Sequence, residues 1–106
     1  MSQRARLAAA LALLATALGA DAQDVAAGKA KAAACAMCHG PVGLAVAPDT
    51  PNLAGQPASY LEEQLKAYRG GTRKHEVMSL MAKPLTDADI GNLAAWFSAI
   101  DRKSVV

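Results

Sequence analysis

Two cysteines and a histidine lie within five consecutive positions of this 106-residue sequence, as Cys35-Ala36-Met37-Cys38-His39. The chain has no other cysteine and only one other histidine. The spacing C-x-x-C-H is the attachment signature of c-type haem. In that chemistry each thiol adds across a haem vinyl group, and the histidine that follows supplies an axial nitrogen to the iron. The motif therefore predicts one covalently attached haem c, held by Cys35 and Cys38, with His39 as an iron ligand.

Three other kinds of site use the same residue types. A thioredoxin-like redox pair needs a strand leading into the motif, whereas an alanine-rich segment, residues 26–34, precedes it here. A zinc site needs a fourth ligand, and the spare histidine is limited to His75. A plain disulfide explains neither the adjacent histidine nor the small number of core-forming side chains. Haem attachment accounts for more of the sequence than any of these three.

The first element that must position the motif is a helix. A proline-free segment dominated by alanine, the best helix former, runs from Asp24 to Cys38. Asp24 is a good N-cap residue, so we predict a first helix that carries the cysteines near its C-terminal end. Residues 40–57 then contain four prolines and three glycines. This composition predicts a long loop. Long ordered loops in small domains usually surround a functional site or a bound group.

Two further helices are predicted after this loop. Residues 57–69 form the first, because Pro57 suits a first helical turn and apolar residues recur at helical spacing until a Gly-Gly pair. Residues 70–85 are predicted to be a second loop. The last helix is predicted from Thr86, a good N-cap, to Ile100. No segment alternates like a strand, so the sequence predicts an all-α domain with large loops. The apolar stripe of the last helix comprises Ile90, Leu93, Ala94, Phe97 and Ile100.

The N-terminus has the order of a secretory signal peptide: a basic start, an apolar run from Leu7 to Leu18, and small residues. The run has 12 residues, against roughly 20 for a membrane-spanning helix, so no lasting anchor is expected. We predict cleavage after Ala22. Residues 1–22 would then be a cleaved signal peptide, and residues 23–106 a single periplasmic domain. An uncleaved N-terminal anchor helix is the alternative.

The size and charge of this domain limit its function. Its only aromatic residues are two tyrosines, one tryptophan and one phenylalanine, so a cofactor is expected to complete a thin core. Without residues 1–22, 9 basic residues face 8 acidic ones, a net charge of +1. This balance is not typical of a nucleic-acid-binding protein.

Four stretches in this order carry a family resemblance: CAMCHG, PNLAGQPASYLEEQLKAYRGGTR, HEVM and LTDADIGNLAAWFSAI. They extend over most of the region from about Val25 to Ile100, which resembles class I cytochrome c, and in particular cytochrome c553 and the single-haem domains of cytochrome c4. The resemblance implies a small fold of three main helices, with long loops wrapped around one haem. It also implies that Gly28 of the first helix packs against Trp96 of the last.

The resemblance further implies the residues around the haem. Met78 would be the second axial ligand of the iron, with Met81 as the runner-up. The carbonyl of Pro51 would accept the Nδ1 proton of His39 and so orient the imidazole. Arg73 is implied as a partner of a haem propionate. An open sixth position, or a histidine as the second ligand, remains an alternative to methionine.

An iron with both axial positions filled binds no substrate and can exchange one electron. The resemblance therefore implies a one-electron carrier with transient redox protein partners rather than an enzyme. Two other functions remain open: a dedicated haem subunit of a periplasmic dehydrogenase or oxidase, and a haem enzyme or sensor with a labile sixth ligand. Neither nucleic acid nor a membrane is an expected partner, while a weak dimer formed through the haem face is an option.

Overall fold

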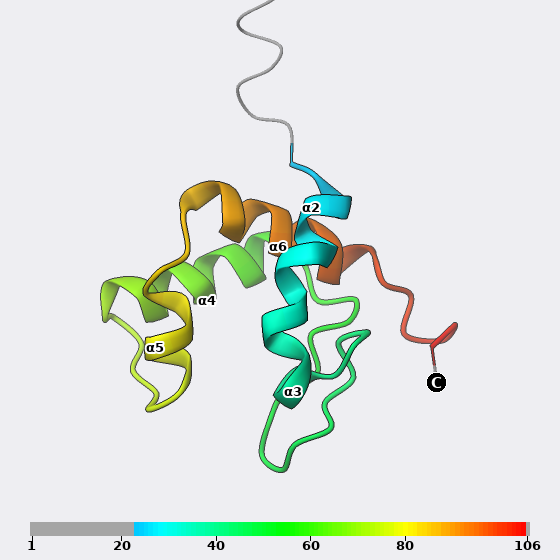
Figure 1. Cartoon of the computed structure of the whole chain (residues 1–106), viewed down its shortest axis with the longest axis horizontal. Helices are drawn as coiled ribbons and strands as arrows, with labels where there is room; N and C mark the ends of the chain where they lie inside the picture. The colour runs from blue at the N-terminus through cyan, green and yellow to red at the C-terminus, as the bar shows by residue number, and fades with distance from the viewer. Residues whose placement is uncertain (1–22, 106) are drawn as a thin grey trace, which may run out of the picture.

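The computed structural model describes residues 23–105 (Figure 1). The regular elements of this part of the chain are all helical, which confirms the predicted fold class. In chain order they are α2 (Val25–Lys31), the 3-10 helix η1 (Ala32–Cys35), α3 (Ala36–His39), α4 (Ala58–Gly70), α5 (Met78–Ala82) and α6 (Asp87–Ala99). The predicted signal peptide, residues 1–22, lies outside the described residues. Within residues 23–105, no helix has the length and apolarity needed to cross a membrane.

The predicted first helix is present as three consecutive pieces, α2, η1 and α3, that together deliver the cysteine motif. It begins at Asp24, whose Oδ1 accepts a hydrogen bond of 3.1 Å from the backbone N–H of Ala27. It ends at Gly40, which has a φ of 81°. The tighter 3-10 turn in the middle was not predicted, because alanine propensity does not distinguish between the two helix types.

The start of this helical segment crosses α6 at close range (Figure 1). A Cβ atom on Gly28 would overlap the backbone carbonyl of Asn92 and lie 2.9 Å from Cβ of Trp96. Asn92 also accepts a 2.9 Å hydrogen bond at its Oδ1 from the backbone N–H of Asp24. The crossing therefore requires glycine at position 28, and the expected contact between Gly28 and the Trp96 position is present.

Helix α6 supplies most of the hydrophobic core. Its N-terminus has a capping box, in which Oγ1 of Thr86 accepts from Asp89 N–H and Oδ2 of Asp89 accepts from Thr86 N–H, both at 3.0 Å. The predicted apolar stripe is buried along its whole length. These side chains are Ile90, Leu93, Ala94, Phe97 and Ile100, and the last four pack with Ala32, Ala54 and Leu61 from other parts of the chain.

Helix α4 agrees with its predicted range to within one residue. Pro57 is its N-cap, and it ends at Gly71 in the left-handed conformation, with a φ of 85°. The prediction of a loop throughout residues 70–85 is wrong, because α5 forms inside it. Residues 72–83 lack both glycine and proline, but the contacts that start α5 come from a histidine, which is not among the usual capping residues.

The loop of residues 40–57 folds under α3 and returns to α4 (Figure 1). The carbonyl of Gly43 accepts hydrogen bonds from Leu53 N–H at 2.8 Å and from Ala54 N–H at 3.0 Å. The carbonyl of Cys38 accepts from Val46 N–H at 3.0 Å. These bonds tie the loop to the cysteine motif and bring its proline-rich part next to α3.

Candidate haem-binding site

The two cysteines are presented on one side of the helical segment that ends in α3. Cys35 and Cys38 are three residues apart, a spacing that makes side chains neighbours on a helix. Both are free thiols; Cys38 is exposed and Cys35 is half-buried. Burial raises the pKa of the Cys35 thiol, opposed in part by the positive charge of Lys31. Cys35 is therefore a protonated thiol at neutral pH.

The imidazole of His39 is buried and its orientation is defined by the loop. Only 7% of the residue is exposed, and its Nδ1 lies 2.9 Å from the carbonyl oxygen of Pro51. A carbonyl can only accept a hydrogen bond, so the proton of the neutral ring is on Nδ1 and Nε2 has a free lone pair. This is the tautomer that a metal-binding histidine with a carbonyl partner adopts. The Pro51 contact implied by the resemblance is thus observed in the structure.

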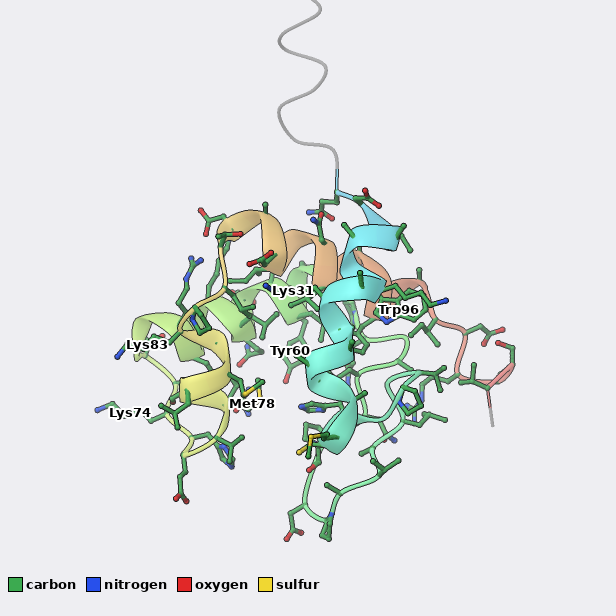
Figure 2. All side chains as sticks on the ribbon, viewed as in Figure 1. Lys31, Tyr60, Lys74, Met78, Lys83 and Trp96 are labelled. Carbon is green, nitrogen blue, oxygen red and sulfur yellow. The ribbon has the colours of Figure 1, made fainter. Side chains whose placement is uncertain are left out.

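Met78 and Met81 differ in the way α5 presents them. Met78 is half-buried, while Met81 is 41% exposed. Met78 lies four residues before Ala82, which is fully buried, so the two share the face of α5 that turns into the protein. Figure 2 shows the side chain of Met78 on the side of α5 that faces α3, with Tyr60 of α4 between them in this view. Met78 is thus the more buried of the two methionines, and the choice of ligand between them stays a prediction.

Arg73 has partners within its own region of the chain. Its Nη1 donates a 2.7 Å hydrogen bond to Oε1 of Gln64, and its guanidinium lies 4.7 Å from the ring centroid of Tyr68. Arg69 donates to the carbonyl of Leu85 at 3.1 Å and to Asp87 at 2.7 Å. These contacts brace the end of α4, and the propionate role of Arg73 stays a prediction.

The structure also bears on the three alternative kinds of site. Helices α2 and η1, not a strand, precede the motif. The two cysteines are not joined by a disulfide. Within residues 23–105, no three His, Cys, Asp or Glu side chains are grouped so that they could hold a metal ion. The residue set therefore fits covalent haem attachment: two neighbouring free thiols, and an imidazole whose Nε2 lone pair is free.

The family model described as Cytochrome c matches residues 25–100. The chain belongs to the cytochrome c family. This cytochrome holds one haem c covalently through Cys35 and Cys38, with His39 in the attachment motif, and it is an electron carrier rather than an enzyme. The haem iron would supply exchange between the ferric and ferrous states, while the chain binds and orients the group.

The comparisons with known proteins agree with this assignment. The chain is 48% identical over 79 residues to cytochrome c-554(548) of Halomonas halodenitrificans, covering 72% of this chain and 95% of that protein. It is 41% identical over 93 residues to cytochrome c4 of Azotobacter vinelandii, covering 79% of this chain and 44% of that protein. The crystal structure of reduced recombinant cytochrome c4 from Pseudomonas stutzeri matches with a TM-score of 0.70 and 39% identity, over 76% of this chain and 47% of that one. The cytochrome thus spans nearly the whole of the first relative and less than half of these two cytochrome c4 chains.

Proposed function

We propose that the iron of this cytochrome is closed by His39 on one face and Met78 on the other, and that the protein is a one-electron carrier. The observation that carries the proposal is the position of Met78 on the inward face of α5, which it shares with the fully buried Ala82. The rival, Met81, is more exposed to solvent. A sulfur that is already turned inward can bind iron without rotation of α5.

This pair of ligands suits electron transfer. A neutral imidazole and a thioether sulfur occupy both axial positions, so no substrate reaches the iron, and Met/His ligation raises the reduction potential. The hydrogen bond from His39 to the Pro51 carbonyl holds the imidazole in place and increases its basicity. Because both ligands are held in place, few protein atoms have to move when the iron changes between the ferric and ferrous states.

The edge of the motif gives electrons a route to partners. Met37, between the two cysteines, is 88% exposed, so the motif lies at the surface and the edge of a haem attached to it would lie close to solvent. A small patch of this kind suits brief contacts with redox proteins, because weak electron-transfer encounters bury less than about 1,200 Å² in total. We therefore propose transient redox partners rather than a permanent complex. Size-exclusion chromatography of the purified holoprotein tests this, since a dedicated subunit would elute with its partner and a dimer at twice the monomer mass.

The iron ligands are tested by visible spectra of the oxidised holoprotein and of two matched variants, Met78→Leu and Met81→Leu. Ferric cytochromes with a methionine ligand have a weak far-red absorption band that reports the iron–sulfur bond. We expect the band in the native protein and in Met81→Leu, and its loss in Met78→Leu. Loss in Met81→Leu alone would move the ligand to Met81. Absence of the band in the native protein, with rapid binding of carbon monoxide after reduction, would indicate an open iron and an enzyme or sensor.

We also propose that the protein is exported to the periplasm and cleaved after Ala22. The basic start, the apolar run from Leu7 to Leu18 and the small residues that follow support this. Mass spectrometry of holoprotein from a periplasmic extract should give a chain that begins at Gln23. A holoprotein that keeps residues 1–22 and sediments with membranes would instead indicate an uncleaved anchor.

A further inference from the structure

His75 lies in the connection between α4 and α5 and makes contacts that were not expected from the sequence. Its side-chain Nδ1 accepts hydrogen bonds from the backbone N–H groups of Val77 and Met78, each at 3.2 Å. Its carbonyl accepts from the N–H of Ser79 at 3.0 Å. In return, Oγ of Ser79 accepts from the N–H of His75 at 3.0 Å. Three consecutive backbone donors at the start of α5 are thus bound to one residue.

These contacts matter because α5 is short. It has five residues, whereas isolated helices below about 12 residues are marginal in water. The first N–H groups of any helix have no partner inside the helix and need one from outside. Here the imidazole fills the role that Ser, Thr, Asp or Asn plays at most helix starts. A large share of the hydrogen bonding that holds α5 in place therefore comes from His75.

The same contacts define the protonation of the ring. An Nδ1 atom that accepts two N–H donors carries no proton, so in the neutral ring the proton is on Nε2. A protonated ring nitrogen has no lone pair for iron. In this arrangement neither nitrogen of His75 can serve as the second axial ligand, which argues against the histidine alternative for that position.

We propose that His75 is a positioning residue for the bond between Met78 and the iron. Its imidazole holds the backbone of Met78 through the N–H of that residue. This contact sets the direction in which the Met78 side chain points from α5. His75 does not touch the iron, and the inference rests on the proposed ligation by Met78. Without the imidazole, α5 opens more often and the sulfur leaves the iron more often.

The test compares three variants of the holoprotein, His75→Ala, His75→Asn and Glu76→Gln. Alanine removes the acceptor, whereas asparagine restores a neutral acceptor of the kind preferred at helix starts. Glu76 is the exposed neighbour of His75 and serves as a matched control. The readouts are the far-red band, the reduction potential and the rate at which added imidazole displaces the methionine sulfur from ferric iron, all at a temperature well below thermal unfolding.

For His75→Ala we expect a weaker far-red band, a lower reduction potential and a rise of about 5- to 30-fold in the rate of displacement, the range that loss of one helix cap produces. His75→Asn and Glu76→Gln should stay within about threefold of the native protein, a spread smaller than the effect of a lost cap. A purely structural role would lower the unfolding temperature of His75→Ala without changing these three readouts.

Three results would overturn the inference, and they differ in whether the assignment of Met78 as the ligand also falls. If Met78→Leu abolishes the far-red band but His75→Ala matches the native protein in all three readouts, the positioning role is wrong and the ligand assignment stands. If Met78→Leu keeps the band, Met78 is not the ligand and both proposals fall. Equal effects of His75→Ala and His75→Asn would also exclude the cap as the cause.

Discussion

The Nδ1 atom of His39 lies 2.9 Å from the carbonyl oxygen of Pro51. The contact joins the end of α3 to the proline-rich loop, and it decides which nitrogen of the ring is free for iron. The acceptor belongs to the backbone, so the contact depends on where the loop runs and not on the side chain at position 51.

This distinction gives a prediction for Pro51→Ala. The variant keeps the carbonyl, so the hydrogen bond and the visible spectrum should be retained. The free energy of unfolding should fall by about 0.4–1 kcal/mol, because the unfolded chain gains freedom without the proline ring. Denaturant titration and the far-red band measure the two effects. A lost band with unchanged stability would show that the ring itself, and not the carbonyl, orients His39.

A second prediction concerns haem attachment. Cys35→Ala and Cys38→Ala should each keep the haem through one thioether bond, and the double variant should lose it on a denaturing gel stained for haem. With one vinyl group left unreacted and conjugated to the ring, each single variant should absorb at a longer wavelength in its reduced form. Full retention of haem on the gel by the double variant would contradict attachment through this motif.

A third prediction uses the crossing of α2 and α6. Gly28→Ala places a methyl group against the carbonyl of Asn92, which belongs to the backbone and cannot move aside easily. Overpacking of this kind costs about 1–3 kcal/mol, and each kcal/mol lowers the unfolding temperature by about 4–8 °C in a domain of this size.

Gly70→Ala is the matched control for Gly28→Ala. Gly70 is the last residue of α4, and a Cβ there would meet nothing within 4 Å. The unfolding temperature of Gly70→Ala should equal or slightly exceed that of the native protein, because alanine is the better helix former. Similar losses in both variants, measured by circular dichroism, would show that the helix crossing is not the cause.

A fourth prediction concerns the stability of the protein at acid pH. The pKa of Asp89 is lowered from its ordinary value of 3.8, first by its hydrogen bond with the Thr86 backbone, and the pKa of Asp87 is lowered first by its hydrogen bond with Arg69. A carboxyl with a lowered pKa in the folded state stabilises the protein above its unfolded pKa, and this contribution is lost as the pH falls through the folded value. The N-terminus of α6 should therefore weaken below about pH 4.

The variant Asp89→Asn checks this dependence. Its urea midpoint should lie below that of the native protein at neutral pH, and the difference should shrink as the pH falls below about 4, where the native carboxyl also becomes neutral. Thr86→Ala, which removes the other half of the capping box, should cost about 1 kcal/mol at neutral pH. A difference for Asp89→Asn that grows as the pH falls would contradict the assigned direction.

Much of this protein was predictable from short stretches of sequence. The motif of Cys35, Cys38 and His39 specifies haem attachment because its spacing matches one helical turn. The buried stripe of α6 follows from the recurrence of apolar residues, and the N-caps Asp24 and Thr86 mark helix starts. Each of these features depends on residues within a few positions of one another, so local periodicity and side-chain chemistry are enough to find them.

Other features were decided by the tertiary structure. From the sequence alone, residues 70–85 are a predicted loop, and Met78 ranks above Met81 only through a family resemblance. The structure adds the formation of α5, the cap supplied by His75 and the inward position of Met78, which support the proposed choice of Met78. Arg73 likewise pairs with Gln64, nine positions away in the chain. The inward position of Met78 depends on how α5 packs against α4, and no periodic pattern in the sequence encodes that packing. The contacts of His75 are local, but histidine is not among the residues that usually mark a helix start.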